Sequence, residues 1–114
     1  RLAAEAIGDL DDDTFDVSVG IAYTGILFAA AIAGGREVGM LQADGQLYGP
    51  GLAGRKVVLV DDVVHSGSNM QRAAKIVAAA GGEVIGYACI IDRSAGKFGS
   101  AERPLWSAHQ TVME

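Results

Sequence analysis

Two adjacent carboxylates, Asp61 and Asp62, follow an apolar run and stand shortly before a turn rich in hydroxyl and glycine residues. At the end of a buried strand, neighbouring carboxylates repel each other and lose hydration, unless a diol, a metal or a developing cation relieves them. The two hydroxyls of a ribose 2,3-diol would relieve this repulsion and loss of hydration by donating hydrogen bonds to the carboxylates. The turn, Ser66-Gly67-Ser68-Asn69, offers hydroxyls and free backbone N–H groups at a helix start, which suit a phosphate. The spacing favours a site that holds a sugar and a phosphate together.

A simpler interpretation of the same residues is a strand followed by a helix cap. Ser and Asn cap many helices that bind nothing, and the two aspartates would then be merely solvated. Each feature taken singly favours this interpretation, whereas their close grouping favours a binding site.

The hydrophobic pattern predicts the elements that must position these residues. Lys56–Val60 is a continuous β-branched run typical of a strand covered on both faces, and Asn69–Ala80 has apolar residues at helical spacing. Strands alternate with helices, so we predict an α/β fold with an open, mostly parallel sheet and helices on both faces. The other predicted elements are strands over 15–19, 37–41, 83–91 and 107–113, helices over 2–7 and 24–33, an acidic linker over 9–13 and a glycine-rich connection over 43–54.

Composition limits the class of protein. With 114 residues, half of them apolar, the chain fits one domain over residues 1–114. Acids outnumber bases 14 to 9, which argues against a nucleic-acid partner. No stretch reaches the roughly 20 apolar residues of a membrane span, and the single Cys89 gives no disulfide framework. We therefore expect a cytoplasmic protein without a membrane partner, in which Cys89 is an inert core thiol and Phe98 and Trp106 are packing residues.

The run VVLVDDVVHSGS over residues 57–68 resembles the phosphoribosyl-diphosphate signature of type I phosphoribosyltransferases, a hydrophobic strand followed by two acids and a Ser/Thr-Gly-Gly/Ser turn. The resemblance implies that Asp61 and Asp62 are catalytic residues that hold the ribose hydroxyls. It also implies Mg²⁺, which these two aspartates would hold indirectly, through ribose or water. The residues implied to cradle the 5-phosphate are His65, Ser66, Gly67, Ser68 and Asn69, and Val64 before them is implied to bind substrate.

A second run, DVSVGIAYTGI over residues 16–26, is similar to the diphosphate-loop strand and turn of orotate phosphoribosyltransferases. The resemblance implies that Tyr23, Thr24 and Gly25 bind substrate. Arg93 falls where those enzymes carry an Asp-Arg pair, which implies a contact to the base. The implied activity transfers 5-phosphoribose from phosphoribosyl diphosphate to a pyrimidine-type base such as orotate and releases diphosphate. A homodimer is implied as well.

The chain departs from the orotate pattern at several positions. Thr24 stands where the family usually has lysine, Asn69 replaces a usual Thr or Ser, and the loop 42–49 lacks the basic residues of the family's mobile loop. The amino-terminal hood is also expected to be missing from a chain that starts at Arg1. Because the departing diphosphate then loses its cations, the alternatives are a non-catalytic ribose-phosphate or nucleotide-binding regulatory domain of this fold, and a structural domain that binds nothing.

Overall fold

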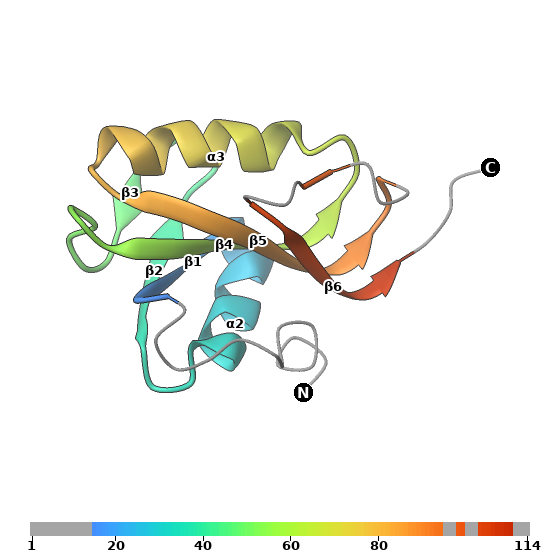
Figure 1. Cartoon of the computed structure of the whole chain (residues 1–114), viewed down its shortest axis with the longest axis horizontal. Helices are drawn as coiled ribbons and strands as arrows, with labels where there is room; N and C mark the ends of the chain where they lie inside the picture. Colours follow the sequence, from blue (N-terminus) through green and yellow to red (C-terminus); the bar gives the residue numbers. More distant parts are fainter. Residues whose placement is uncertain (1–14, 95–97, 100–102, 111–114) are drawn as a thin grey trace.

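A six-stranded sheet forms the centre of the molecule in the computed structural model, which describes residues 15–94, 98–99 and 103–110 (Figure 1). The strand order is β3-β2-β1-β4-β5-β6, and every neighbouring pair is parallel except β2 and β3. The predicted open, mostly parallel sheet is therefore confirmed. The elements are β1 (Val17–Ile21), α2 (Ala22–Ala33), β2 (Glu37–Leu41), β3 (Leu47–Tyr48), β4 (Lys56–Val64), α3 (Ser68–Ala79), β5 (Glu83–Asp92) and β6 (Leu105–Gln110).

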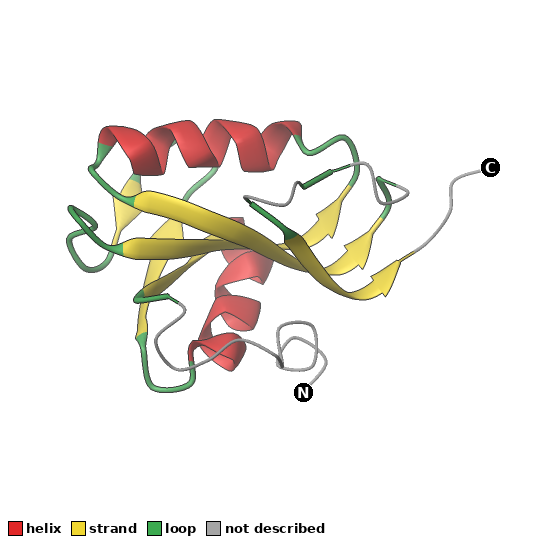
Figure 2. Ribbon diagram, in the orientation of Figure 1, coloured by secondary structure: helices red, strands yellow, loops and turns green. Residues whose placement is uncertain are grey.

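The two described helices cover opposite faces of the sheet, as Figure 2 shows. Side chains alternate between the faces of a strand, and β4 uses both faces. Val57 and Leu59 belong to the cluster under α3, whereas Val58 and Val60 belong to the cluster under α2. The run from Lys56 to Val60 is therefore a strand covered on both faces, as predicted. The prediction of helices on both faces of the sheet is confirmed as well.

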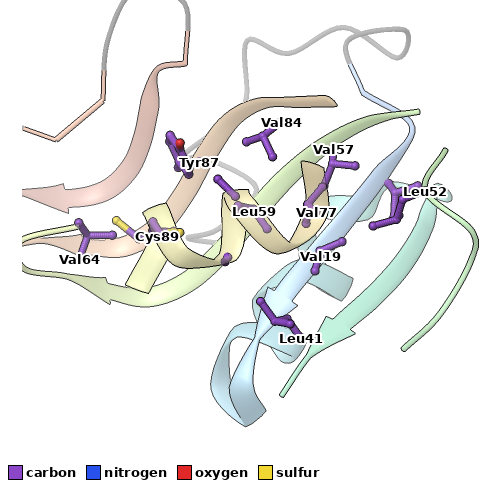
Figure 3. Packing of buried hydrophobic residues seen from close by; sticks show 14 residues of the cluster. Val19, Leu41, Leu52, Val57, Leu59, Val64, Val77, Val84, Tyr87 and Cys89 are labelled. Carbon is purple, nitrogen blue, oxygen red and sulfur yellow. The ribbon is translucent and has the colours of Figure 1, made fainter. Parts of the chain in front are cut away.

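Helix α3 is amphipathic and packs through its apolar stripe. Its buried residues, Met70, Ala73, Ala74 and Val77, recur at intervals of three and four positions. Figure 3 shows Val77 among residues of the sheet that belong to the same cluster, including Val57 and Leu59. Burial of each valine or leucine side chain stabilises the fold by about 1.5–3 kcal/mol, so the core fixes the start of α3 relative to β4.

Strand β4 is longer than we predicted, and this changes the place of the two aspartates. It continues to Val64 because the ten-residue β5 runs beside it, pairing Asp61 with Cys89 and Val64 with Asp92. The prediction that both acids follow the end of the strand is wrong, because both lie inside β4.

Two other predicted boundaries differ from the structure. The glycine-rich connection contains β3, which returns antiparallel to β2, and β6 begins at Leu105 rather than at Ser107. Residues 111–113 of the predicted last strand, the predicted helix over 2–7 and the acidic linker lie outside the described residues. None of the helices in the described ranges has the length and apolarity needed to span a bilayer.

The chain changes direction across the sheet between β1 and β4. It passes from β1 to β2 on one side and then returns to the other side of β1 to form β4. In open α/β sheets, ligands bind at such a switch point, outside the carboxyl ends of the strands. The segments after Ile21 and Val64 meet at this edge of the sheet.

Candidate functional site

A pocket of about 90 Å³ opens where β4 passes into α3. All residues that we predicted in this segment line it, except Asp62. The structure therefore brings a carboxylate and the hydroxyl-rich turn into one concave surface. The lining residues are Asp61, Val63, Val64, His65, Ser66, Gly67, Ser68, Asn69 and Met70.

The turn before α3 exposes the amino-terminal end of a helix to this pocket. Gly67 is the N-cap and has φ 88°, a left-handed conformation that favours glycine. The Ser68 N–H donates to Ser66 Oγ at 3.3 Å, and Ser66 Oγ donates to Ser68 Oγ at 3.2 Å. The first turn of α3 contains no acidic residue, so no side chain there neutralises the positive end of the helix. These donors suit an anion such as phosphate.

Asp61 is half-buried at the wall of the pocket. Burial, with a further contribution from the neighbouring Asp62 carboxyl, raises the pKa of Asp61 from 3.8 to about 7. Its Oδ1 accepts a hydrogen bond from the Asp62 N–H at 2.8 Å, and Asp62 Oδ1 accepts one from the Val63 N–H at 2.8 Å. Near neutral pH, a donor hydroxyl or a cation in the pocket would favour the ionised form of Asp61.

The first turn of α2 packs directly against β4. A Cβ at Gly25 would lie 2.6 Å from the Val60 carbonyl oxygen and 3.5 Å from the Asp61 Cα, so only glycine allows this approach. Ala22 has φ 56°, a strained conformation for a residue other than glycine. Gly25 is therefore brought beside Asp61. Tyr23 and Thr24 lie in the first turn of α2, but their side chains are outside the described part of the structure.

Arg93 is held at the rim of the pocket by its backbone. Its N–H donates to the carbonyl oxygen of Val64 at 2.7 Å, and its side chain is exposed. The residues on either side of it in the chain, Asp92 and Ser94, are both buried. The predicted base contact therefore extends from a fixed position next to a lining residue.

The connection between β2 and β3 is a closed hairpin turn. The Gln42 N–H donates to the Gln46 carbonyl oxygen, and the Gln46 N–H donates to Asp44 Oδ1, both at 2.9 Å. Beside it, a second hollow of about 210 Å³ reaches the start of α2. The lining residues are Ala22, Met40, Gln42, Ala43 and Asp44, which include one carboxylate and no cation.

Sequence reasoning missed the connection between the end of β5 and the pocket. Asp92 and Ser94 form a buried hydrogen-bonded pair, for which their spacing of two residues was an available signal.

The interpretation of Phe98 as a packing residue is confirmed, since its ring lies 4.8 Å from that of Tyr87. Cys89 is buried, which confirms its predicted place in the core, and burial raises the pKa of its thiol to about 12. In the described ranges, no group of three or more His, Cys, Asp or Glu side chains could hold a metal.

Comparison with protein families matches residues 36–102 to the family described as phosphoribosyl transferase domain. The orotate phosphoribosyltransferase of Sulfurisphaera tokodaii is 34% identical over 100 residues, which cover 81% of this chain and 51% of that protein. That of Xanthomonas axonopodis pv. citri is 39% identical over 105 residues, which cover 80% of this chain and 46% of that protein. The chain spans about half the length of these curated relatives.

Solved structures share the arrangement of strands and helices. The orotate phosphoribosyltransferase of Mycobacterium tuberculosis H37Rv in complex with 5-phospho-alpha-D-ribosyl 1-diphosphate has a TM-score of 0.78 and 26% identity, covering 96% of this chain and 69% of that chain. The adenine phosphoribosyltransferase of Rhodothermus marinus has a TM-score of 0.81 and 18% identity, covering 96% of this chain and 77% of that chain. The second likeness shows the fold alone.

Proposed function

This chain belongs to the phosphoribosyl transferase domain family, and on that basis we propose that it transfers 5-phosphoribose from phosphoribosyl diphosphate to a pyrimidine-type base such as orotate, releasing diphosphate. The observation that carries this proposal is the pocket in which Asp61 and the turn before α3 meet. The names of the two relatives, both orotate phosphoribosyltransferases, support the choice of base. The matched range contains both the pocket and Arg93.

The proposed phosphate subsite is the turn from His65 to Asn69. Backbone N–H groups at the start of α3 and the hydroxyls of Ser66 and Ser68 would donate to the 5-phosphate oxygens. His65 is exposed at the same rim and adds a ring N–H donor. Asn69 would donate through its amide, where the related signature has a hydroxyl.

The proposed ribose subsite is Asp61, with Asp62 beside it. An ionised Asp61 would accept hydrogen bonds from the ribose hydroxyls, and the ligand would replace water around this half-buried group. As the bond to diphosphate loosens, positive charge develops on the sugar ring. A fixed carboxylate next to the ring stabilises that charge more than it stabilises the ground state.

The donor set also fits Mg²⁺ held partly by the ligand. Magnesium is usually bound through one or two carboxylates together with substrate phosphates, and it keeps several waters. Asp61 and Asp62 supply two carboxylates, and no larger cluster is present in the described ranges. We propose that they hold Mg²⁺ indirectly, through ribose or water. When bound, Mg²⁺ would offset the charge of the departing diphosphate.

Arg93 is the proposed contact to the base. Its backbone is fixed to Val64 at the pocket rim, which leaves an exposed guanidinium free to orient toward a bound ring. The planar guanidinium donates paired hydrogen bonds to carboxylate and carbonyl oxygens, both of which orotate carries.

A second candidate function is a regulatory module that binds ribose 5-phosphate or a nucleotide without turnover. The hairpin 42–46 favours it, because the hollow beside the start of α2 contains Asp44 and no cation. Stabilising the departing diphosphate normally requires positive groups, and this chain has none among the lining residues there.

The two candidates are separated by calorimetric titration with phosphoribosyl diphosphate and Mg²⁺, followed by addition of orotate and assay of released diphosphate. Binding with release supports the transferase, and binding without release supports the regulatory module. The variant Asp61→Asn with Asp62→Asn should lose binding in either case, whereas Glu83→Gln, at the start of β5, should bind like the parent. Equal affinity of the double variant and the parent would contradict the site assignment.

We further propose a cytoplasmic homodimer. Leu27 of α2 is 71% exposed and Tyr48 of β3 is 50% exposed, and each is a candidate contact with a second copy of the chain. The single, buried cysteine suits a reducing compartment. Light scattering should give twice the chain mass for the parent and a smaller mass for Leu27→Lys. A monomeric parent would contradict the proposed dimer.

A further inference from the structure

The outer side of the phosphate-binding turn is covered by an aromatic ring. A Cβ at Gly67 would lie 2.0 Å from Cδ1 and 2.3 Å from Cε1 of Phe98. Real side-chain contacts are never this short, so the ring lies directly against the glycine backbone. Phe98 is not among the residues that line the pocket, so its ring contacts the turn without being part of the pocket wall.

Phe98 is itself fixed by a chain of buried polar groups. Its N–H donates to Ser94 Oγ at 3.1 Å, and Ser94 Oγ donates to Asp92 Oδ1 at 2.5 Å. Asp92 is 4% exposed and Ser94 is 8% exposed, so water competes little for these bonds. The Ser94 N–H donates to the same Asp92 oxygen at 2.8 Å. Two hydrogen bonds to one buried carboxylate oxygen fix the start of the segment that leads to Phe98.

The ring of Phe98 has a second fixed neighbour. It is tilted by 58° against Tyr87, with centroids 4.8 Å apart, and Tyr87 is buried in the core under α3. Aromatic pairs with tilted rings at this separation attract each other. The ring is therefore held between the core of the sheet and the Gly67 backbone.

We propose that Phe98, fixed by Asp92 and Ser94, is a positioning residue that holds the turn 66–68 in its phosphate-binding conformation. The inference rests on the proposed function. Ordering a backbone segment on binding costs conformational entropy, so a turn that is already ordered before binding gains affinity. Because Arg93 lies between Asp92 and Ser94, the same network also fixes the backbone of the proposed base contact relative to the phosphate turn.

The first test compares Phe98→Ala with Phe98→Tyr, which keeps the ring. We expect Phe98→Ala to speed amide hydrogen exchange in residues 66–69 and to weaken ribose 5-phosphate binding about tenfold, while Phe98→Tyr remains close to the parent. Ile76→Ala is the matched control, because Ile76 packs against the same cluster from farther along α3. It should lower thermal stability without changing the affinity.

The second test is a double-mutant cycle of Gly67→Ala and Phe98→Ala. Gly67→Ala alone should weaken ribose 5-phosphate binding strongly but measurably, because the new Cβ meets the ring and φ is 88°. Removing the ring in that background relieves the contact, so the double variant should bind more tightly than Gly67→Ala. Additive losses would mean that the two residues act independently and would overturn the inference.

The outcomes separate this inference from the proposed function. If the parent binds ribose 5-phosphate, and Phe98→Ala leaves both the exchange of residues 66–69 and the affinity unchanged, the positioning role is overturned and the proposed function stands. If the parent binds no ribose 5-phosphate, the proposed function fails, and the positioning role fails with it.

Discussion

Asp61 links the stability of the fold to pH. Its pKa in the folded chain is about 7 against an ordinary 3.8, so between these values the folded chain keeps a proton that the unfolded chain has lost. Stability contributed by this group therefore falls as pH rises from about 4 to about 7, and it stays low above that. The ionised Asp61 carboxylate therefore destabilises the folded chain at the place where we propose that the ligand binds.

Asp61→Asn should remove this dependence. The asparagine keeps an oxygen for the Asp62 N–H, and it carries no charge at any pH. We expect the variant to be more stable than the parent by about 1 kcal/mol at about pH 8, after allowance for the partial exposure of the carboxyl, and to match it near pH 4. Thermal unfolding at both pH values measures this. A variant that is less stable than the parent at about pH 8 would contradict the claim that burial of the ionised Asp61 carboxylate destabilises the fold.

The same carboxyl should make ligand binding depend on pH. If ribose hydroxyls donate to ionised Asp61, affinity for ribose 5-phosphate rises with pH and gains about tenfold from about pH 6 to about pH 8. The phosphate of the ligand also ionises near pH 6. Subtracting the pH profile of Asp61→Asn, measured by the same calorimetric titration, isolates the contribution of the carboxyl. Identical profiles would exclude Asp61 from the sugar subsite.

At the level of elements, the first turn of α2 depends on close approach to β4. Gly25→Ala places a Cβ 2.6 Å from the Val60 carbonyl oxygen, and rigid backbone on both sides cannot yield easily. We expect a loss of about 2 kcal/mol of unfolding free energy in urea. Gly51→Ala is the control, because its Cβ would meet nothing within 4 Å. Equal stability of the two variants would mean that the turn is not packed on β4.

The hairpin between β2 and β3 should decide which ligands bind well. Asp44→Lys brings a cation to the hollow beside the start of α2, where we expect the diphosphate. The variant should bind phosphoribosyl diphosphate roughly tenfold more tightly, with ribose 5-phosphate unchanged. Glu83→Lys makes the same charge change at the start of β5 and should have no such selectivity. An equal gain for both ligands would indicate a long-range effect of net charge instead.

For the whole molecule, the hydrophobic pattern was sufficient to predict the class of the fold. The β-branched run in β4 and the helical spacing of α3 led to the right elements, and alternation of strands and helices led to the parallel sheet. The extension of β4 through Val64 was not predicted, because it depends on pairing with β5, which is distant in sequence. The two-residue β3 was missed because a hairpin this short has almost no periodicity of its own.

The site was predicted only in part. The residues from Asp61 to Asn69 were predicted because carboxylates and a hydroxyl-rich turn follow one another closely in the sequence. The structure gathers them around one pocket, with Asp62 outside its lining. The contact between Phe98 and Gly67 was not predicted, because the two residues are distant in sequence and no local motif links them. The closed hairpin was also unforeseen, although the Asp44 side chain accepts one of its hydrogen bonds and was an available signal.

The central claim is that the pocket at the carboxyl end of β4 binds the phosphoribosyl group, and amide chemical shifts during titration with ribose 5-phosphate test it most directly. We predict saturable shifts that are largest at Ser66, Gly67, Ser68 and Asn69 and smaller at Asp61 and Arg93. None of these shifts should occur in Asp61→Asn combined with Asp62→Asn. No shifts in the parent, or shifts confined to other parts of the sheet, would contradict the account.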